Sequence, residues 1–86
     1  MQYTYEFELF RDDGWIVACP FDMEGATQER DIKEAAEMAA EWLRMDIEHR
    51  LMHGIKVPTA TFGNVPKEGG TIMVVSVEVG RPKKAV

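Results

Sequence analysis

Residues 31–53, DIKEAAEMAAEWLRMDIEHRLMH, predict the one long helix around which this 86-residue chain is arranged. Asp31 and Glu34 form a capping-box pattern, in which a short acceptor side chain satisfies free backbone N–H groups and the later acid reaches back. Alanine, leucine and methionine favour the helix, no proline interrupts it, and Gly54 stands where a left-handed cap would end it. We therefore expect a helix of about 22 residues beginning near Ile32.

The apolar residues of this helix fall into two stripes, because successive side chains are about 100° apart. The expected core stripe contains Ile32, Ala36, Ala39, Leu43 and Ile47. The second stripe contains Ala35, Met38, Trp42, Met45 and His49, and the polar side carries Lys33, Glu37, Glu41, Arg44 and Glu48. One stripe is enough to pack a helix on a sheet. The second stripe therefore either meets a wide sheet or is buried by another molecule.

Four other stretches are typical of β-strands. Residues 2–10 alternate between apolar and polar, and Asp13-Gly14 predicts a tight hairpin, because glycine supplies the positive φ that the turn requires. A second strand, 15–19, ends at Pro20, which has no N–H to donate, and residues 26–29 form a short third strand. The last strand, 71–79, is apolar on nearly every side chain, so it is either central in its sheet or paired with something outside the chain.

This order predicts an α+β fold, β-β-β-α-β, with a small mixed sheet and the helix packed on one face. The right-handed crossover rule favours a last strand that lies beside the first and parallel to it. Residues 55–70 contain prolines and glycine pairs and are longer than a median loop. Loops of this length often carry function or mobility.

Length and charge limit the possible functions. We expect a single domain, residues 1–80, and a short basic tail, 81–86. The net charge of −5 disfavours direct nucleic-acid binding and favours a basic partner. A single cysteine, no signal-peptide pattern and no long apolar run lead us to expect a cytoplasmic protein that binds no membrane. Because so small a chain buries little surface, we also expect a dimer or higher oligomer.

Several motifs, taken in order, resemble the N-terminal domain of HicB-type antitoxins. They are DGW at 13–15, PFDMEGAT at 20–27, DIKEAAEMA at 31–39, and Pro58 after the helix. In that family a proline, an aspartate and a glycine form the bend between strands two and three, which implies this role for Pro20, Asp22 and Gly25. The spacing departs at Phe21, an extra residue, and at Glu29-Arg30, where a glycine is usual.

The resemblance implies a partial ribonuclease H-like fold and a non-catalytic function. Such antitoxins bind and block a small basic ribonuclease of the HicA type, which acts on mRNA. They commonly continue into a DNA-binding domain, which this sequence does not contain, so we expect no operator binding by this chain. The alternative is a structural or oligomerising adaptor domain without a toxin, and a metal-dependent ribonuclease H-like nuclease ranks third.

Three surfaces are candidates for contact with a partner. Trp42 with Met38 and Met45 is the anchor type that dominates interfaces when exposed, unless these side chains are simply core. Trp15 and Phe21 are the second candidate, with capping of the core as the alternative. The third is the edge of the last strand at Ile72 and Val74, unless that strand is interior.

Candidates for chemistry are weaker. Glu6 or Glu8, with Glu34 and Glu78, are the only acids in the elements that carry metal-binding carboxylates in ribonuclease H-like enzymes. We read Glu6 and Glu8 as a solvated strand face, Glu34 as the cap partner and Glu78 as the exposed end of a strand.

Two other residue sets also have plainer interpretations. His49 and His53 have the spacing of a two-histidine zinc pair but lack further ligands and suit the helix C-terminus. Cys19 is expected to be a small buried hydrophobe. The glycine-containing pairs at 63–64 and 69–70 are turn residues. We therefore expect no catalytic site, metal or cofactor.

Overall fold

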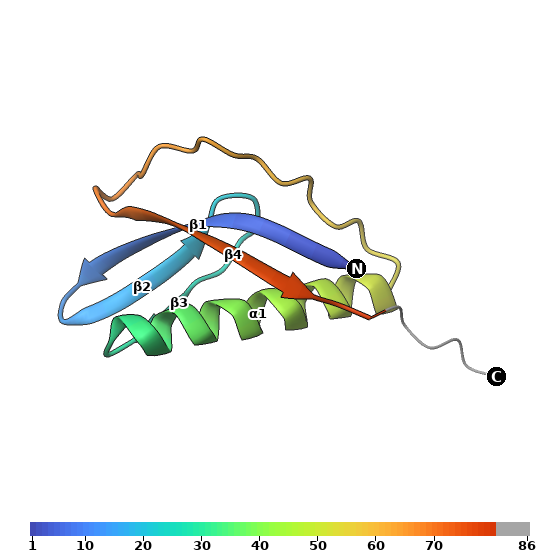
Figure 1. Ribbon diagram of the computed structural model, residues 1–86, viewed down its shortest axis with the longest axis horizontal. Coiled ribbons are helices and arrows are strands. Elements are labelled where there is room, and N and C mark those ends of the chain that lie inside the picture. The colour runs from blue at the N-terminus through green and yellow to red at the C-terminus, as the bar shows by residue number, and fades with distance from the viewer. Residues whose placement is uncertain (81–86) are drawn as a thin grey trace.

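The computed structural model describes residues 1–80, so the predicted basic tail lies outside the described residues. The elements follow the predicted order: β1 (Gln2–Asp12), β2 (Trp15–Pro20), β3 (Thr27–Glu29), α1 (Ile32–Met52) and β4 (Thr71–Glu78). The strands form one sheet in the order β3-β2-β1-β4. Helix α1 lies across one face, and the segment 55–70 runs back across the other (Figure 1). The predicted α+β fold is confirmed.

The sheet is antiparallel throughout, so the predicted parallel pairing of the last strand, and with it the mixed sheet, is wrong. β4 pairs antiparallel with β1, with Glu78 opposite Gln2 and Thr71 opposite Leu9. Helix α1 carries the chain along the length of the sheet, and 55–70 then carries it back over the opposite face (Figure 1). β4 therefore starts at the end of the sheet where α1 started. A parallel strand would have required the helix alone to make the crossover.

The helix cap at Asp31, the helix end and the hairpin are confirmed, but within residues 1–80 the Glu34 carboxylate accepts no hydrogen bond from the Asp31 N–H, so the capping box is only half formed. The Asp31 carboxylate accepts the N–H of Glu34 at 2.8 Å. At the other end Gly54 has φ +65, and the Ile55 N–H donates to the Arg50 carbonyl at 2.8 Å, which is the Schellman arrangement. Asp13 and Gly14 both have positive φ, as a two-residue hairpin of the favoured twist requires.

The core lies between α1 and the facing side of β1 and β4. Its helical residues are Ala35, Ala39, Leu43 and Ile47, all fully buried. Their uniform spacing of four follows a ridge that is inclined to the helix axis, so the helix crosses the sheet at an angle.

This inclination corrects the predicted core stripe at its first turn. Ala35 is buried in place of Ala36, which is half-buried, and Ile32 is 56% exposed. Ile32 lines an open pocket of about 400 Å³ together with Leu9 and Ile16, at the end of the sheet where β1 extends beyond β4.

Candidate functional site

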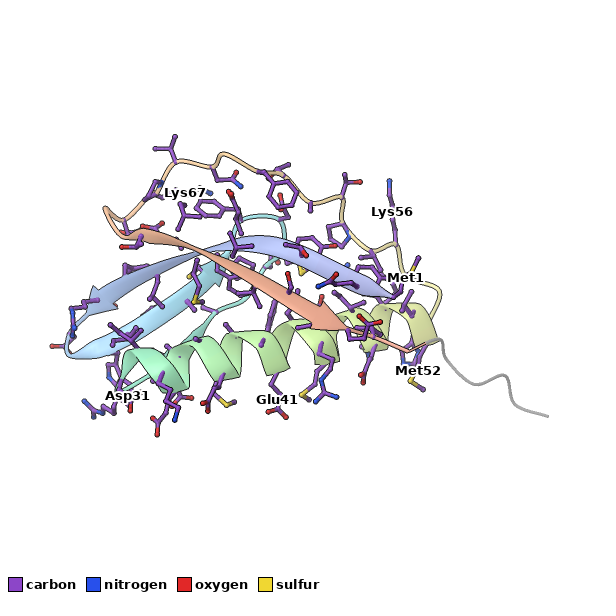
Figure 2. The ribbon with its side chains drawn as sticks, in the orientation of Figure 1. Met1, Asp31, Glu41, Met52, Lys56 and Lys67 are labelled. Carbon is purple, nitrogen blue, oxygen red and sulfur yellow. The ribbon has the colours of Figure 1, made fainter. Side chains whose placement is uncertain are left out.

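The side of α1 that faces away from the sheet carries a stripe of alternating glutamate and methionine. Its members are Glu34, Met38, Glu41, Met45, Glu48 and Met52. The spacing of four, three, four, three and four keeps all six within about 40° of one line along the helix. Met45 and Met52 are 59% and 72% exposed, and Met38 is 39% exposed. Figure 2 shows Glu41 and Met52 pointing away from the sheet. We call these six residues the Met–Glu stripe.

The predicted second stripe of the helix is therefore divided between core and solvent. Ala35 is core, whereas Met38, Met45 and His49 are exposed. Trp42 is half-buried and belongs with the core. Its ring packs edge-on against Phe7, with the two ring centroids 6.2 Å apart.

The close approach of Gly25 also places Trp42 in the packed interior. A Cβ added at Gly25 would lie 2.5 Å from Cζ2 of Trp42, so only glycine lets the bend between β2 and β3 pass the indole. The exposed side chains of the predicted anchor are Met38 and Met45, which belong to the Met–Glu stripe.

Trp15 and Phe21, the second predicted surface, lie in different environments. The guanidinium of Arg30 sits over the ring of Trp15, 3.8 Å from its centroid, and both Trp15 and Phe21 are half-buried. The Phe21 N–H donates to the carbonyl of Glu6, so Phe21 extends the pairing of β2 past Pro20. Trp15 and Phe21 lie opposite Asp12 and Glu6 of β1, on the face away from α1, and neither packs against the core cluster of residues 1–80, so the expected capping of the core is not seen.

β4, the third predicted surface, is an edge strand. Its only partner in the sheet is β1, so its outer edge is free within residues 1–80. Val74 is 59% exposed on the face opposite α1, and Ile72 beside it is half-buried. Of the two possibilities for this apolar strand, the interior position is excluded.

The segment 55–70 is held on the sheet by carboxylates, which the sequence analysis did not predict. Glu8 accepts three backbone N–H groups, from Lys67, Glu68 and Gly70, at 2.8 to 2.9 Å. Glu6 accepts the N–H groups of Gly63 and Asn64 and the side-chain amide of Asn64. The Asp22 carboxylate accepts hydrogen bonds from the N–H and the hydroxyl of Thr61. We call residues 61–70 the strap (Figure 2, where Lys67 is labelled).

The interpretation of Glu6 and Glu8 as a solvated face is therefore wrong. Glu6 is 8% exposed and Glu8 is 3% exposed, because the strap covers them. Alternation along a strand separates two faces but does not say what covers the polar one. The available signal was a long run with three glycines and no regular structure, residues 55–70, since such a segment has many N–H groups that need acceptors.

The hydrogen bonds favour the charged form of both glutamates. The backbone and side-chain donors of Asn64 lower the pKa of Glu6, opposed by burial and assisted by the Gly63 N–H. Burial alone raises the pKa of Glu8, but the N–H groups of Gly70, Lys67 and Glu68 outweigh it, so the pKa lies below its usual value. A carboxylate surrounded by N–H donors is a poor general base and has few lone pairs left for a metal.

The remaining candidates for chemistry lie apart from one another. Glu34 and Glu78 are at opposite ends of the molecule, at the start of α1 and the end of β4. The rings of His49 and His53 are 4.4 Å apart between centroids, and residues 1–80 contain no group of three or more potential metal ligands. Cys19 is half-buried, and burial together with the charges of Glu8 and Glu68 raises the pKa of its thiol.

Comparison of the chain with models of protein families, with curated proteins and with solved structures returns no match. Within residues 1–80, no helix is both long and apolar enough to cross a membrane. With no relative to indicate a site, the candidate site is chosen from the exposure and chemical type of its own residues. It has two parts, the Met–Glu stripe of α1 and the free edge of β4. The stripe was missed because the helix was divided by its apolar residues only, although methionine recurs at 38, 45 and 52 and glutamate at 34, 41 and 48.

Proposed function

We propose that this chain is a non-catalytic binding module that covers a basic protein. The resemblance to HicB-type antitoxins indicates which protein this is: a small basic ribonuclease of the HicA type, blocked by the bound chain. The proposal places the chain in the cytoplasm, with the mRNA that such a toxin cleaves.

The observation that carries the proposal is the Met–Glu stripe. Methionine side chains are flexible and polarisable, so they adapt to apolar side chains of varied shape and are frequent on binding surfaces. Glutamates between them select lysine and arginine on the partner. Glu34 and Glu41 are exposed and form no ion pair with any residue of 1–80, while Glu48 pairs only loosely with Arg44, at 3.7 Å. Both side-chain types are thus available for a partner.

The distribution of charge supports the same partner. Residues 1–80 contain all fifteen acidic residues and only seven of the ten lysines and arginines. A ribonuclease needs a basic surface to attract the phosphates of RNA, and an acidic protein is attracted to that same surface. Such complementarity raises the association rate more than it raises affinity. It also makes the rate depend on salt.

The test is co-expression with the small basic protein encoded by a neighbouring reading frame, followed by two measurements on the purified pair. The first is cleavage of mRNA by the basic protein, which we expect the chain to inhibit. The second is the Kd of the complex. We expect Glu41→Lys and Met45→Ser each to weaken it by about tenfold or more, because one brings like charges together and the other removes an apolar anchor.

The control is Glu68→Lys, which makes the same charge change on the strap, across the sheet from α1. It should change the Kd by less than about threefold, because salt screens the interaction between the partner and an exposed charge outside the interface. Loss of affinity in Glu68→Lys equal to that in Glu41→Lys would show that net charge and not the stripe binds the partner. Undiminished mRNA cleavage in the presence of the chain would refute the antitoxin function itself.

A further inference from the structure

We propose that two copies of this chain pair through the free edges of β4, antiparallel about a two-fold axis at Val74, so that both four-stranded sheets join into one. This inference does not depend on the proposed toxin, because it uses the free edge of β4 and not the Met–Glu stripe of α1, and because the partner has the same sequence.

The register of β1 and β4 shows which backbone groups of β4 face outward. Met1 and Val79 exchange both hydrogen bonds, with the Val79 N–H donating to the Met1 carbonyl at 2.8 Å and the Met1 amino group donating to the Val79 carbonyl at 2.9 Å. Bonded and non-bonded pairs alternate along an antiparallel ladder. Val75 and Val77 therefore bond to β1, and the N–H and C=O groups of Ile72, Val74 and Ser76 point to the free edge.

This edge lacks the features that prevent strands from pairing. Proteins protect edges with short strands, lysine, proline or bulges. β4 has eight residues, and from Thr71 to Val79 it contains no lysine, proline or glycine. Its one charged residue, Glu78, is paired with the N-terminal amino group at 2.9 Å. The opposite edge, β3, is protected because it has only three residues.

A second copy fits this edge because residues 71–77 of β4 carry no charge, whereas the rest of the described chain is acidic. Two copies that approach at β4 bring no acid against another acid over Ile72 to Ser76. The outer face contributes apolar contact as well, since the side chain of Val74 is 59% exposed. Two-fold pairing keeps both α1 helices on one face, so the Met–Glu stripes stay accessible.

The position of the two-fold axis follows from the alternation of side chains along β4 and from the charge of Glu78. Two residues that are directly opposed in an antiparallel pair have their side chains on the same face of the sheet. In a symmetric dimer the two-fold axis must therefore lie between a residue and its own copy, and not between two neighbouring positions. An axis at Val74 opposes Val74 to its own copy and Ile72 to Ser76. An axis at Val75 or Ser76 would instead place Glu78 against the apolar Ile72 or Val74, which costs the desolvation of a carboxylate.

The first test is the mass of the chain in solution by light scattering after size exclusion. We expect about twice 9.8 kDa for the wild type. Val74→Pro removes an N–H that faces outward and should give a folded monomer, because proline is tolerated at the solvent side of an edge strand. Val74→Lys should also give a monomer, since two like charges then meet at the axis. Circular dichroism checks the fold, and Val74→Lys decides the test if Val74→Pro does not fold.

Met45→Lys is the matched control. Met45 is also 59% exposed, but it lies on α1, away from the edge, so this variant should remain a dimer. Val74→Cys in a Cys19→Ala background should form an interchain disulfide with oxidised glutathione, whereas Ser76→Cys should not, because Ser76 faces Ile72 of the second copy. A wild-type mass of 9.8 kDa at millimolar concentration, or a dimer that persists in Val74→Lys, would overturn the proposal. Preferential cross-linking through position 76 would overturn the register.

Discussion

Replacement of Gly25 by alanine tests whether Trp42 is part of the core or an anchor for a partner. Gly25 has φ +135, a conformation that side chains with a Cβ rarely adopt, and the new Cβ would lie 2.5 Å from Cζ2 of Trp42. Carbon atoms pack at about 3.5 to 4.0 Å, so the ring or the bend must shift by about 1 Å. The ring cannot move freely, because it also packs edge-on against Phe7, which is fully buried.

The expected loss of stability combines two effects. Backbone strain at a positive φ costs about 1 to 3 kcal/mol, and overpacking of a filled site costs about 1 to 3 kcal/mol. An 86-residue domain is stable by only about 4 to 13 kcal/mol, so a loss of this size is a large share of the total. For a domain of this length, each 1 kcal/mol lowers Tm by about 4 to 8 °C. We therefore expect Gly25→Ala to lower Tm by about 10 °C or more.

Urea and thermal unfolding, followed by circular dichroism, measure this change. Gly80→Ala is the control, because a Cβ there meets nothing within 4 Å, and it should change the free energy of unfolding by less than about 0.5 kcal/mol. Trp42→Phe replaces the indole with a smaller ring. In that background Gly25→Ala should lower the free energy of unfolding by less, and the difference should be about the energy assigned to overpacking. Equal effects of Gly25→Ala and Gly80→Ala, or no coupling to Trp42, would show that Trp42 does not pack as described.

Three further variants or reactions test the carboxylates, the helix cap and the thiol. Because the pKa of Glu8 is lowered on folding, its stabilising contribution is complete above the unfolded pKa of about 4.3 and is lost as pH falls through the folded value. Glu8→Gln should therefore flatten the acid side of the stability curve and speed amide exchange in the strap, and Glu68→Gln should do neither. Asp31→Ala should lower the free energy of unfolding by about 1 kcal/mol in urea, through loss of the N-cap bond. Because the pKa of Cys19 is raised, its thiol should react with iodoacetamide at pH 8 more slowly than free cysteine, and equal rates would contradict the described burial.

The carboxylates of β1 also bear on the ranking of functions. Glu6 and Glu8 occupy the strand from which a ribonuclease H-like enzyme would take a metal ligand. Here their oxygens accept hydrogen bonds from the strap, which uses the lone pairs that a metal would need. They act as acceptors that fasten an irregular segment to the sheet. Their hydrogen bonds to the strap therefore weigh against Glu6 and Glu8 as metal ligands.

Local elements were predictable because their causes lie within a few residues. Asp13-Gly14 sets the hairpin by the φ values that glycine allows, and the Asp31 cap and the Gly54 terminus set the helix ends by hydrogen bonds to neighbouring backbone groups. The alternation of residues 2–10 was enough to place Tyr5 and Phe7 on the core face. None of these outcomes depends on the path of the chain elsewhere.

Other features depend on contacts between distant segments, and no local pattern could predict them. The direction of β4 depends on the return of residues 55–70 across the sheet, which binds Glu6 and Glu8 about sixty positions away in the sequence. The same segment, residues 55–70, also buries the polar face of β1 that carries Glu6 and Glu8. Likewise, helical spacing placed Met38, Trp42 and Met45 on one stripe, but the angle at which α1 crosses the sheet decides that Trp42 packs inward and the methionines face solvent. The sequence by itself determined the elements and their ends, because these follow from short-range sterics and hydrogen bonds. Only the tertiary structure decided which surfaces remain open for a partner, because exposure depends on what the rest of the chain covers.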